Sequence, residues 1–479
     1  MTARKTGLAI AAAIVVGLAL RLACWTGLIA SDDLTHAWAA THLWHDPIER
    51  GMPDGPDSPY TVNARRVGVN LPLALAATIA GPSERSLGAM TLAESLLGVL
   101  ACAAWAGALA GRRAAVLAAW LAAVTPVDVW HATIWLQDDL YAAGLAGAMA
   151  AAAWAVRTER ARWWIVCGAL LGYLQYVKES AVLVVAVLVL AGLVRSVRAR
   201  RLERGLVALV AGFAAMQALA CAYWAIAMGD PLYYLHAWLG RQAAVEGEAA
   251  ARPFPGNLVR LGLYLGYHQA LGLGLLISAY FGVRWLRRGA APARMRQDAA
   301  LVAVVQLALL LHVLRWGAWT QRYLLQLTPF AIALGAAGLV AVWPDRSARA
   351  RLGLYVAIVA STALGLVIGH PQHGRYRADV VRAAARALPT LAPLDVPVVV
   401  VAGPRPAHYT DRALALLDGY RHDRFRVTAD PTAVTRGLVV YCSLERHPTR
   451  PAAAPGRRVF TAETRGGREW IEVYAVGLP

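Results

Sequence analysis

The chain has 479 residues, 58% of them hydrophobic, and its 47 lysines and arginines against 29 acids give a formal charge of +18. A mean hydropathy of +0.47 and repeated apolar runs of about 20 residues exclude an ordinary water-soluble protein and indicate a polytopic helical membrane protein. The charge does not indicate a nucleic-acid partner, because the arginines form short clusters between apolar runs, where they determine topology. The five cysteines show no disulfide framework or thiolate metal site.

Eleven membrane spans are predicted from these apolar runs. In chain order they cover approximately residues 7–30, 87–110, 114–128, 138–156, 163–177, 180–194, 205–228, 259–283, 298–314, 323–343 and 352–369. The first run follows Arg4 and Lys5 and is too long for the apolar core of a signal peptide, so we interpret it as an uncleaved anchor helix.

Basic residues predict the orientation of these spans. Alternate connections hold about twenty positive charges, against about ten in the connections of the opposite side. The N-terminus is therefore expected in the cytoplasm and the segment after His370 outside. The arginine and alanine bias fits a GC-rich bacterial gene, so we expect the bacterial inner (plasma) membrane.

Two domains are predicted. Residues 1–369 form the transmembrane domain, in which residues 31–86 are the first extracytoplasmic loop with interfacial helices. Residues 370–479 form an extracytoplasmic α/β domain, because strand-like segments alternate with segments of helical spacing, namely 378–388, 397–402, 411–417 and 437–441. The fold class is thus an all-α polytopic membrane protein with a small C-terminal α/β domain, for which we expect a structural or acceptor-binding role.

Two acidic pairs lie at outer span ends. Asp32 and Asp33 follow the first span, with His36 one helical turn on if the helix continues. They could be a solvated helix end, or one of them could act as a general base on an acceptor hydroxyl. Asp138 and Asp139 occupy the outer turn before the fourth span, where the helix dipole accounts for one acid and the second favours a functional role.

Two cations are predicted on the same side. Lys178, one of only two lysines, lies between the fifth and sixth spans, and Arg322 precedes Tyr323 at the head of the tenth. Each alone could be an interfacial side chain, but together they could bind a phosphate, and Tyr323 is a further candidate at the donor phosphate. Carboxylates and cations on one face fit displacement at a carbon whose leaving group is an anionic phosphate. Further candidate contacts to the acceptor or donor are His36, Arg66, Glu179 and His268.

A metal site is the less favoured interpretation of the histidines in the first loop. His36, His42 and His45, with Asp46, have a spacing that could bind a metal if the segment were helical, but such spacing is common by chance. No cofactor is predicted with certainty, and a divalent metal stays an open alternative.

The order of these features resembles the GT-C glycosyltransferases, specifically the branch of protein O-mannosyltransferases and lipid A aminoarabinose transferases. The resemblance covers residues 7–345 in fragments, which are Asp32-Asp33, residues 81–86, residues 125–128 leading to Asp138-Asp139, residues 172–180, and Arg322-Tyr323-Leu324-Leu325 with Pro329. It implies a polyprenyl-phosphate-linked sugar as donor, Asp32 as base and Asp33 as helper. Relatives usually have Asp-Glu in the first loop and one aspartate in the second motif, so the roles of Asp33 and of the second pair stay open.

The sequence therefore predicts an integral-membrane glycosyltransferase that moves a sugar to an acceptor hydroxyl outside the cytoplasm, with inversion. The acceptor class (lipid, glycan or protein) and the sugar stay open. A transporter or flippase of a lipid-linked anion is the alternative, but it would need a path across the membrane and internal repeats. A third interpretation is an inactive scaffold that uses the C-terminal domain for interaction.

Overall fold

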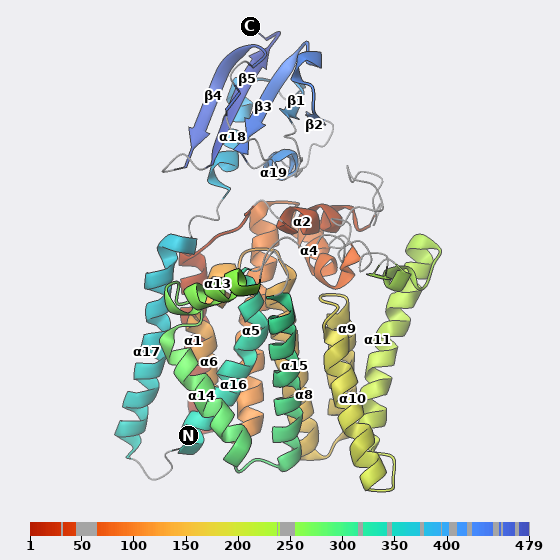
Figure 1. The fold of residues 1–479 in the computed structure, drawn as a ribbon, viewed down its shortest axis with the longest axis vertical. Helices are drawn as coiled ribbons and strands as arrows, with labels where there is room; N and C mark the ends of the chain where they lie inside the picture. Colours follow the sequence, from red (N-terminus) through yellow and green to blue (C-terminus); the bar gives the residue numbers. More distant parts are fainter. Residues whose placement is uncertain are drawn as a thin grey trace. The chain divides into compact units, whose positions relative to one another are not determined.

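The structure of the chain is a computed structural model of residues 1–479. It describes residues 1–29, 32–44, 65–236, 238–239, 254–314, 320–342, 347–373, 378–393, 395–401, 410–418, 424–443, 450–451, 454–464 and 469–478 (Figure 1). The chain divides into two compact units. The first unit comprises Met1–Trp25, Arg65–Val69 and Thr91–Arg375, and the second comprises Thr26–Ala64, Asn70–Met90 and Tyr376–Pro479.

The first unit consists of helices. They are α1 (Ala3–Ala23), α6 (Arg112–Val124), α7 (Pro126–His131), α8 (Gln137–Thr158), α9 (Ala161–Gln175), α10 (Ala181–Arg198), α11 (Arg204–Met228), α13 (Phe254–Gly266), α14 (Leu273–Arg288), α15 (Ala293–Val313), η2 (Gln321–Leu327), α16 (Thr328–Val342) and α17 (Ala348–His373). Helices α4 (Val67–Ala80) and α5 (Glu84–Ala110) have residues in both units.

Eight helices among the described residues are long and apolar enough to cross a membrane. They are Ala3–Ala23, Glu84–Ala110, Gln137–Thr158, Ala181–Arg198, Arg204–Met228, Ala293–Val313, Gln321–Val342 and Ala348–Gly369. The predicted fold class, a polytopic all-α membrane protein with a small C-terminal sheet domain, is confirmed. Two further predicted spans correspond to the shorter helices α6 and α9, of 13 and 15 residues.

The predicted single span 259–283 is wrong, because two helices, α13 and α14, replace it. Between them Gly272 has a φ of +70°, which breaks the helix and favours glycine. A Cβ there would lie 2.6 Å from the carbonyl oxygen of Thr362 in α17, so the turn also needs glycine for packing.

The first predicted span, 7–30, also ends early, at Ala23. Gly27 has a φ of +61°, and the chain that follows is held by side chains of the second unit. The Leu28 N–H donates to Glu84 Oε1 at 3.0 Å. The carbonyl oxygens of Thr26 and Leu28 accept from Arg382 Nη2 at 3.0 and 2.8 Å. These side chains replace the helical hydrogen bonds that the sequence predicted.

A buried ionic network joins α1 to α5, α6 and α7. The side chain of Arg21 is fully buried and forms an ion pair with Asp128. Its Nε donates to Ser95 Oγ at 2.8 Å and Nη1 to the Ala123 carbonyl at 3.0 Å, while Ser95 Oγ donates to Asp128 Oδ1 at 3.0 Å. A charge inside an apolar helix requires such partners.

Helices α9 and α11 pack closely at glycines. A Cβ on Gly168 would collide with the backbone carbonyl of Leu209, and one on Gly172 would lie 2.7 Å from Met216 Cβ. Small residues four apart let helix backbones approach in membranes, where van der Waals packing drives association. The Gly168 and Gly172 spacing therefore fixes the contact between these two helices.

We expect Gly168→Ala to lower the thermal unfolding temperature of the full-length protein in detergent. The added methyl group meets backbone rather than a movable side chain, and overpacking of this kind costs about 1–3 kcal/mol. Gly147→Ala in α8 is the matched control, because its Cβ would make an ordinary contact at 3.6 Å with Leu170. Equal unfolding temperatures for the two variants would refute this packing argument.

The second unit contains α2 (Asp32–His42) and the C-terminal sheet domain. That domain has α18 (Asp379–Leu391), α19 (Thr410–Leu417), η5 (Pro431–Ala433) and the strands β1 (Val398–Val401), β2 (Phe425–Thr428), β3 (Gly437–Cys442), β4 (Arg457–Glu463) and β5 (Trp470–Val476). The sheet order is β2-β1-β3-β5-β4. Strand β1 pairs in parallel with β2 and β3, and β5 pairs antiparallel with β3 and β4.

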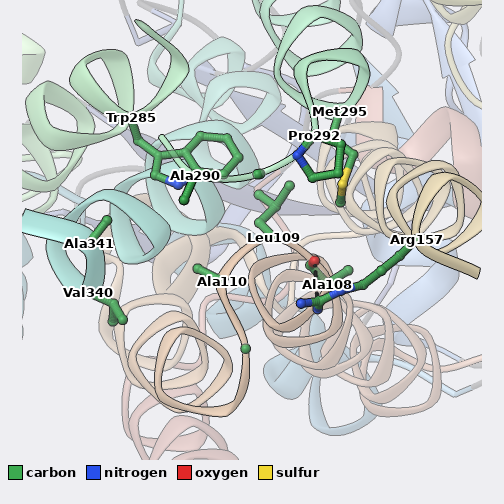
Figure 2. A pocket seen from close by; sticks show the side chains of 12 residues that line it. Ala108, Leu109, Ala110, Arg157, Trp285, Ala290, Pro292, Met295, Val340 and Ala341 are labelled. Atoms are coloured by element: carbon green, nitrogen blue, oxygen red, sulfur yellow. Dashed lines mark hydrogen bonds between the residues drawn. The ribbon is translucent and has the colours of Figure 1, made fainter. Parts of the chain in front are cut away.

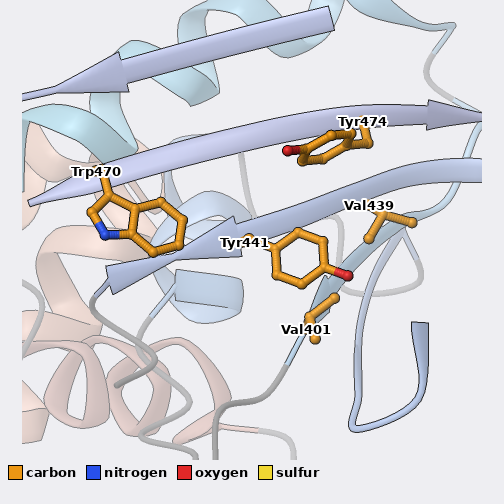
Figure 3. Packing of buried hydrophobic residues seen from close by; sticks show 5 residues of the cluster. All are labelled: Val401, Val439, Tyr441, Trp470 and Tyr474. Atoms are coloured by element: carbon orange, nitrogen blue, oxygen red, sulfur yellow. The ribbon is translucent and has the colours of Figure 1, made fainter. Parts of the chain in front are cut away.

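The two predicted strands and two predicted helices of this domain are confirmed as β1, β3, α18 and α19. An aromatic cluster packs on the sheet (Figure 3), formed by Val401, Val439, Tyr441, Trp470 and Tyr474. The rings of Tyr441 and Tyr474 meet edge to face with centroids 5.8 Å apart. The domain boundary at residue 370 stays a prediction.

Candidate active site

A cluster of opposite charges forms at the first turn of α8. Lys178 Nζ lies 2.8 Å from Asp138 Oδ1, and Arg322 Nε lies 3.6 Å from Asp138 Oδ2. The three side chains come from α8, from the α9–α10 connection and from η2, so the fold joins segments far apart in the sequence. Asp138 is 3% exposed, whereas Lys178 and Arg322 are 12% and 15% exposed. The Asp138 carboxylate is thus the most buried of the three groups, and the two cations are partly exposed.

Aromatic rings surround the two cations. Lys178 Nζ lies 5.2 Å from the ring centre of Tyr323 and 5.5 Å from that of Tyr141. The Arg322 guanidinium lies 5.5 Å from the Tyr323 ring. Ring faces attract cations, most strongly where water is excluded. Four predicted site residues, Asp138, Lys178, Arg322 and Tyr323, therefore form one cluster.

A second ion pair supports the Lys178 segment. Arg66 Nη2 donates to Glu179 Oε2 at 2.9 Å and to Oε1 at 3.2 Å, and both side chains are largely buried. The backbone is tied as well, since the Gly68 N–H donates to the Tyr176 carbonyl at 3.1 Å. Arg66 and Glu179, predicted as ligand contacts, are thus placed where they fix the position of the neighbouring Lys178.

The second acidic pair separates into two environments. Asp139 is 3% exposed, and neither of its carboxyl oxygens has a hydrogen-bond partner among the described residues. Successive residues of a helix point about 100° apart, so Asp139 does not share the cations of Asp138. The charges that act on it include the carboxylates of Asp128 and Asp138 and the guanidinium of Arg21. Asp138 is therefore the acid of this pair that contacts Lys178 and Arg322.

His131, at the end of α7, was not predicted as part of the site. Its Nδ1–H donates to the Val127 carbonyl at 2.7 Å, and burial lowers the pKa of His131 below its usual range. Both Asp138 and Arg322 act on its charge. The sequence around His131 does not indicate that Asp138 and Arg322 lie near it. Only the fold brings α8 and η2 close to the end of α7.

We expect the contribution of His131 to the thermal stability of the protein to fall as the pH drops from 7.5 to 5.5. A base with a lowered pKa in the folded state binds fewer protons than in the unfolded state, where its pKa is about 6.5. Stability is therefore present above that unfolded-state pKa and is lost as the pH falls below it. Unfolding temperatures of the wild type and of His131→Gln at both pH values measure this, and the variant should lose less. The same loss in both proteins would contradict the role of His131.

The first acidic pair lies in the second unit, at the start of α2. Asp33 is fully buried and its Oδ2 accepts from the Ile29 N–H at 2.8 Å, whereas Asp32 is partly exposed. His36 lies one turn on in the same helix, which is the separate helix α2 and not a continuation of the first span, and its Nδ1–H donates to Asn70 Oδ1 at 2.8 Å. Asp32 thus has the more accessible carboxylate. Asp33 and His36 instead use their side chains in hydrogen bonds within the second unit, to the Ile29 backbone and to Asn70. The catalytic roles of this pair stay predictions.

The remaining predicted residues have separate positions. His268 lies in the α13–α14 connection of the first unit, with its ring centre 5.3 Å from that of Tyr264 and 5.4 Å from that of Tyr267. His42 stacks on Trp38 at 4.2 Å, and six residues along α2 place it on a different side of the helix from His36. His45 and Asp46 lie outside the described residues. In the described part of the chain, no group of three or more His, Cys, Asp or Glu could hold a metal ion.

The chain is similar to known proteins in sequence and in structure. Residues 67–224 match the family model described as dolichyl-phosphate-mannose-protein mannosyltransferase. This segment includes Asp138, Asp139, Lys178 and Glu179, but neither Asp32 nor Arg322. A sequence comparison with curated proteins finds no match.

Several solved structures share the fold. ArnT from Cupriavidus metallidurans, bound to undecaprenyl phosphate, is 15% identical with a TM-score of 0.60, over 99% of this chain and 98% of that chain. The archaeal oligosaccharyltransferase AglB from Archaeoglobus fulgidus, in complex with an inhibitory peptide and a dolichol-phosphate, is 12% identical with a TM-score of 0.52, over 91% and 69%. The arabinofuranosyltransferase AftD from Mycobacteria is 14% identical with a TM-score of 0.53, over 100% and 40%.

The chain is therefore a multi-pass membrane protein with the fold of the GT-C glycosyltransferases. Residues 67–224 are similar to the mannosyltransferase family model, and the resemblance predicted from the sequence is confirmed.

Proposed function

We propose that this protein is an integral-membrane glycosyltransferase that moves a sugar from a polyprenyl-phosphate-linked donor to an acceptor hydroxyl, with inversion. The transfer takes place on the extracytoplasmic side of a bacterial plasma membrane, where the C-terminal domain also lies. The N-terminus is cytoplasmic.

The observation that carries this proposal is the cluster of Lys178 and Arg322 around Asp138. Two partly exposed cations backed by a buried carboxylate present a positive face at the ends of membrane helices. A phosphate is the anion that such a pair of donors suits, with lysine as a point charge and arginine as a directional donor. The tyrosine rings at Tyr141 and Tyr323 reduce contact with water and strengthen these interactions.

The comparisons support the donor class. The ArnT structure contains undecaprenyl phosphate, and the AglB structure contains a dolichol-phosphate with a peptide. Both ligands are polyprenyl phosphates, the lipid that would remain after the sugar has left. In this protein the phosphate would bind at Lys178 and Arg322, with the lipid tail between the helices.

The chemistry is a single displacement. The acceptor oxygen attacks the anomeric carbon while its proton passes to a carboxylate, for which we propose Asp32. The bond between the anomeric carbon and the phosphate oxygen breaks, and its electron pair stays on the phosphate. Lys178 and Arg322 stabilise the charge that develops on this leaving group, which lowers the barrier. Because attack and departure occur on opposite faces, the anomeric configuration inverts.

The test is transfer by the purified full-length protein from undecaprenyl-phosphate donors that carry radiolabelled sugars. Pentose, hexose and amino-sugar donors are each supplied with lipid, glycan and peptide acceptors, in the presence of Mg²⁺ or of a chelator. We expect labelled product and equimolar undecaprenyl phosphate with at least one pair of substrates. Donor binding without transfer or hydrolysis in every combination would overturn the proposed function, and the chelator shows whether a divalent ion assists.

A further inference from the structure

A pocket opens in the first unit, far along the helices from the α8 N-terminus. Its volume is about 360 Å³, and it is lined where α5, α8, α14 and α16 end and α15 begins (Figure 2). Small or apolar residues form most of the lining, including Ala108, Leu109 and Met295. The Arg112 guanidinium, directly after the pocket residue Gly111, donates to the Met1 carbonyl at 3.1 Å, so this is the end of the helices that holds the N-terminus.

Arg157 is the charged residue of this pocket. Its Nη1 donates to the carbonyl oxygens of Gly107 and Ala108 at 3.2 and 3.0 Å, which fixes the guanidinium over the C-terminal end of α5. The residue is exposed, and within the described residues its Nε and Nη2 have no hydrogen-bond partner. Figure 2 shows Arg157 on one side of the pocket and the indole of Trp285 on the other. Two guanidinium donors therefore remain for a ligand.

The surroundings favour an anion. The connections 111–113, 157–162 and 284–296 contain ten arginines and one acid, Glu159. None of the described lining residues is acidic. Basic pockets between membrane helices on the cytoplasmic side are typical binding sites for anionic lipid headgroups.

We propose that this pocket binds the phosphate headgroup of an anionic phospholipid from the adjacent leaflet. The free donors of Arg157 contact the phosphate, while Trp285, Leu109 and Met295 contact the glycerol and the first acyl carbons. The lipid source is preferred to free phosphate, because the lining beside Arg157 is apolar and lies at the ends of membrane helices. This site is separate from the cluster around Asp138 and does not depend on the proposed reaction.

The test is native mass spectrometry of the delipidated full-length protein with phosphatidylglycerol, phosphatidylcholine or inorganic phosphate. We expect preferential binding of phosphatidylglycerol, weakened about tenfold by Arg157→Gln, which is the size of one lost charge-assisted hydrogen bond. Ala290→Trp should have a similar effect, because Ala290 is an exposed residue that lines the pocket and a large ring there would fill it. Arg160→Gln, an exposed arginine outside the lining, is the matched control.

Thermal unfolding of each variant checks that the fold is kept, and Arg157→Lys should restore part of the binding. Undiminished phosphatidylglycerol binding by both pocket variants would overturn the proposal. An equal loss of phosphatidylglycerol binding in Arg160→Gln would also overturn the proposal. The lipid would then be attracted by the general positive charge of this region and not by the pocket. Arg157-dependent binding of inorganic phosphate without lipid would reject the lipid as the ligand.

Discussion

Sugar transfer should fall by about two to four orders of magnitude in Asp32→Asn, the range that a positioned general base contributes. Asparagine keeps the shape and the helix-capping ability of aspartate but cannot take the acceptor proton. Asp32 is partly exposed at the start of α2, so the substitution buries no new polar group. We therefore expect unchanged membrane insertion, thermal unfolding and donor binding. Initial rates of label transfer, with unfolding curves for both proteins, measure the effect.

Asp33→Asn is the second variant to measure, because it tests which of the two acids is the base. Asp33 is fully buried and accepts from the Ile29 N–H, so its substitution should lower the unfolding temperature as well as the rate. Raising the pH does not restore a missing carboxylate, and Asp32→Asn should stay slow between pH 6 and 9. Normal turnover by Asp32→Asn would remove this residue from the mechanism, and a stable but inactive Asp33→Asn would transfer the role of base to Asp33.

Most of the membrane fold could be predicted because hydropathy reports it directly. The predicted run 205–228 is the helix Arg204–Met228, and the predicted run 138–156 is Gln137–Thr158. The failures lie where the tertiary structure overrides the apolar run. At Gly272 the chain turns against α17, and after Ala23 the side chains of Glu84 and Arg382 hold the backbone.

The charges of the site could be predicted one by one, but their pairing could not. An ionisable residue beside an apolar span is a signal in itself, which identified Lys178 and Arg322. The same signal existed for Arg21, inside the first predicted span, and the structure places this side chain in the buried network with Ser95 and Asp128. Which member of the pair Asp138-Asp139 contacts the cations depends on the rotation of α8, and no sequence pattern gives that rotation.

The pairing of Lys178 with Asp138 predicts two opposite effects on donor binding. We expect Lys178→Met to weaken binding of undecaprenyl phosphate about 10- to 100-fold, because a hydrogen bond to a charged group contributes about 1.5–3 kcal/mol. Asp138→Asn should bind the lipid phosphate at least as tightly as the wild type, because Asp138 competes with the phosphate for both cations. Its transfer rate should nevertheless fall, since Lys178 and Arg322 lose the carboxylate that orients them. Titration with fluorescent undecaprenyl phosphate measures the affinities.

Measurements of stability distinguish a role of Lys178 in phosphate binding from a purely structural ion pair with Asp138. Removal of Lys178 leaves the 3%-exposed carboxylate of Asp138 with Arg322 at 3.6 Å as its ion-pair partner among the described residues, and breaking a buried pair in this way costs about 3–5 kcal/mol. The double variant Lys178→Met with Asp138→Asn should recover much of the unfolding temperature, because the buried carboxylate that Lys178 neutralises is removed as well. It should not recover lipid phosphate binding, since the cation is still absent. Lys178→Arg keeps the charge and should bind nearly normally. If the double variant regained both stability and binding, the pair would be structural and Lys178 would not contact the donor phosphate.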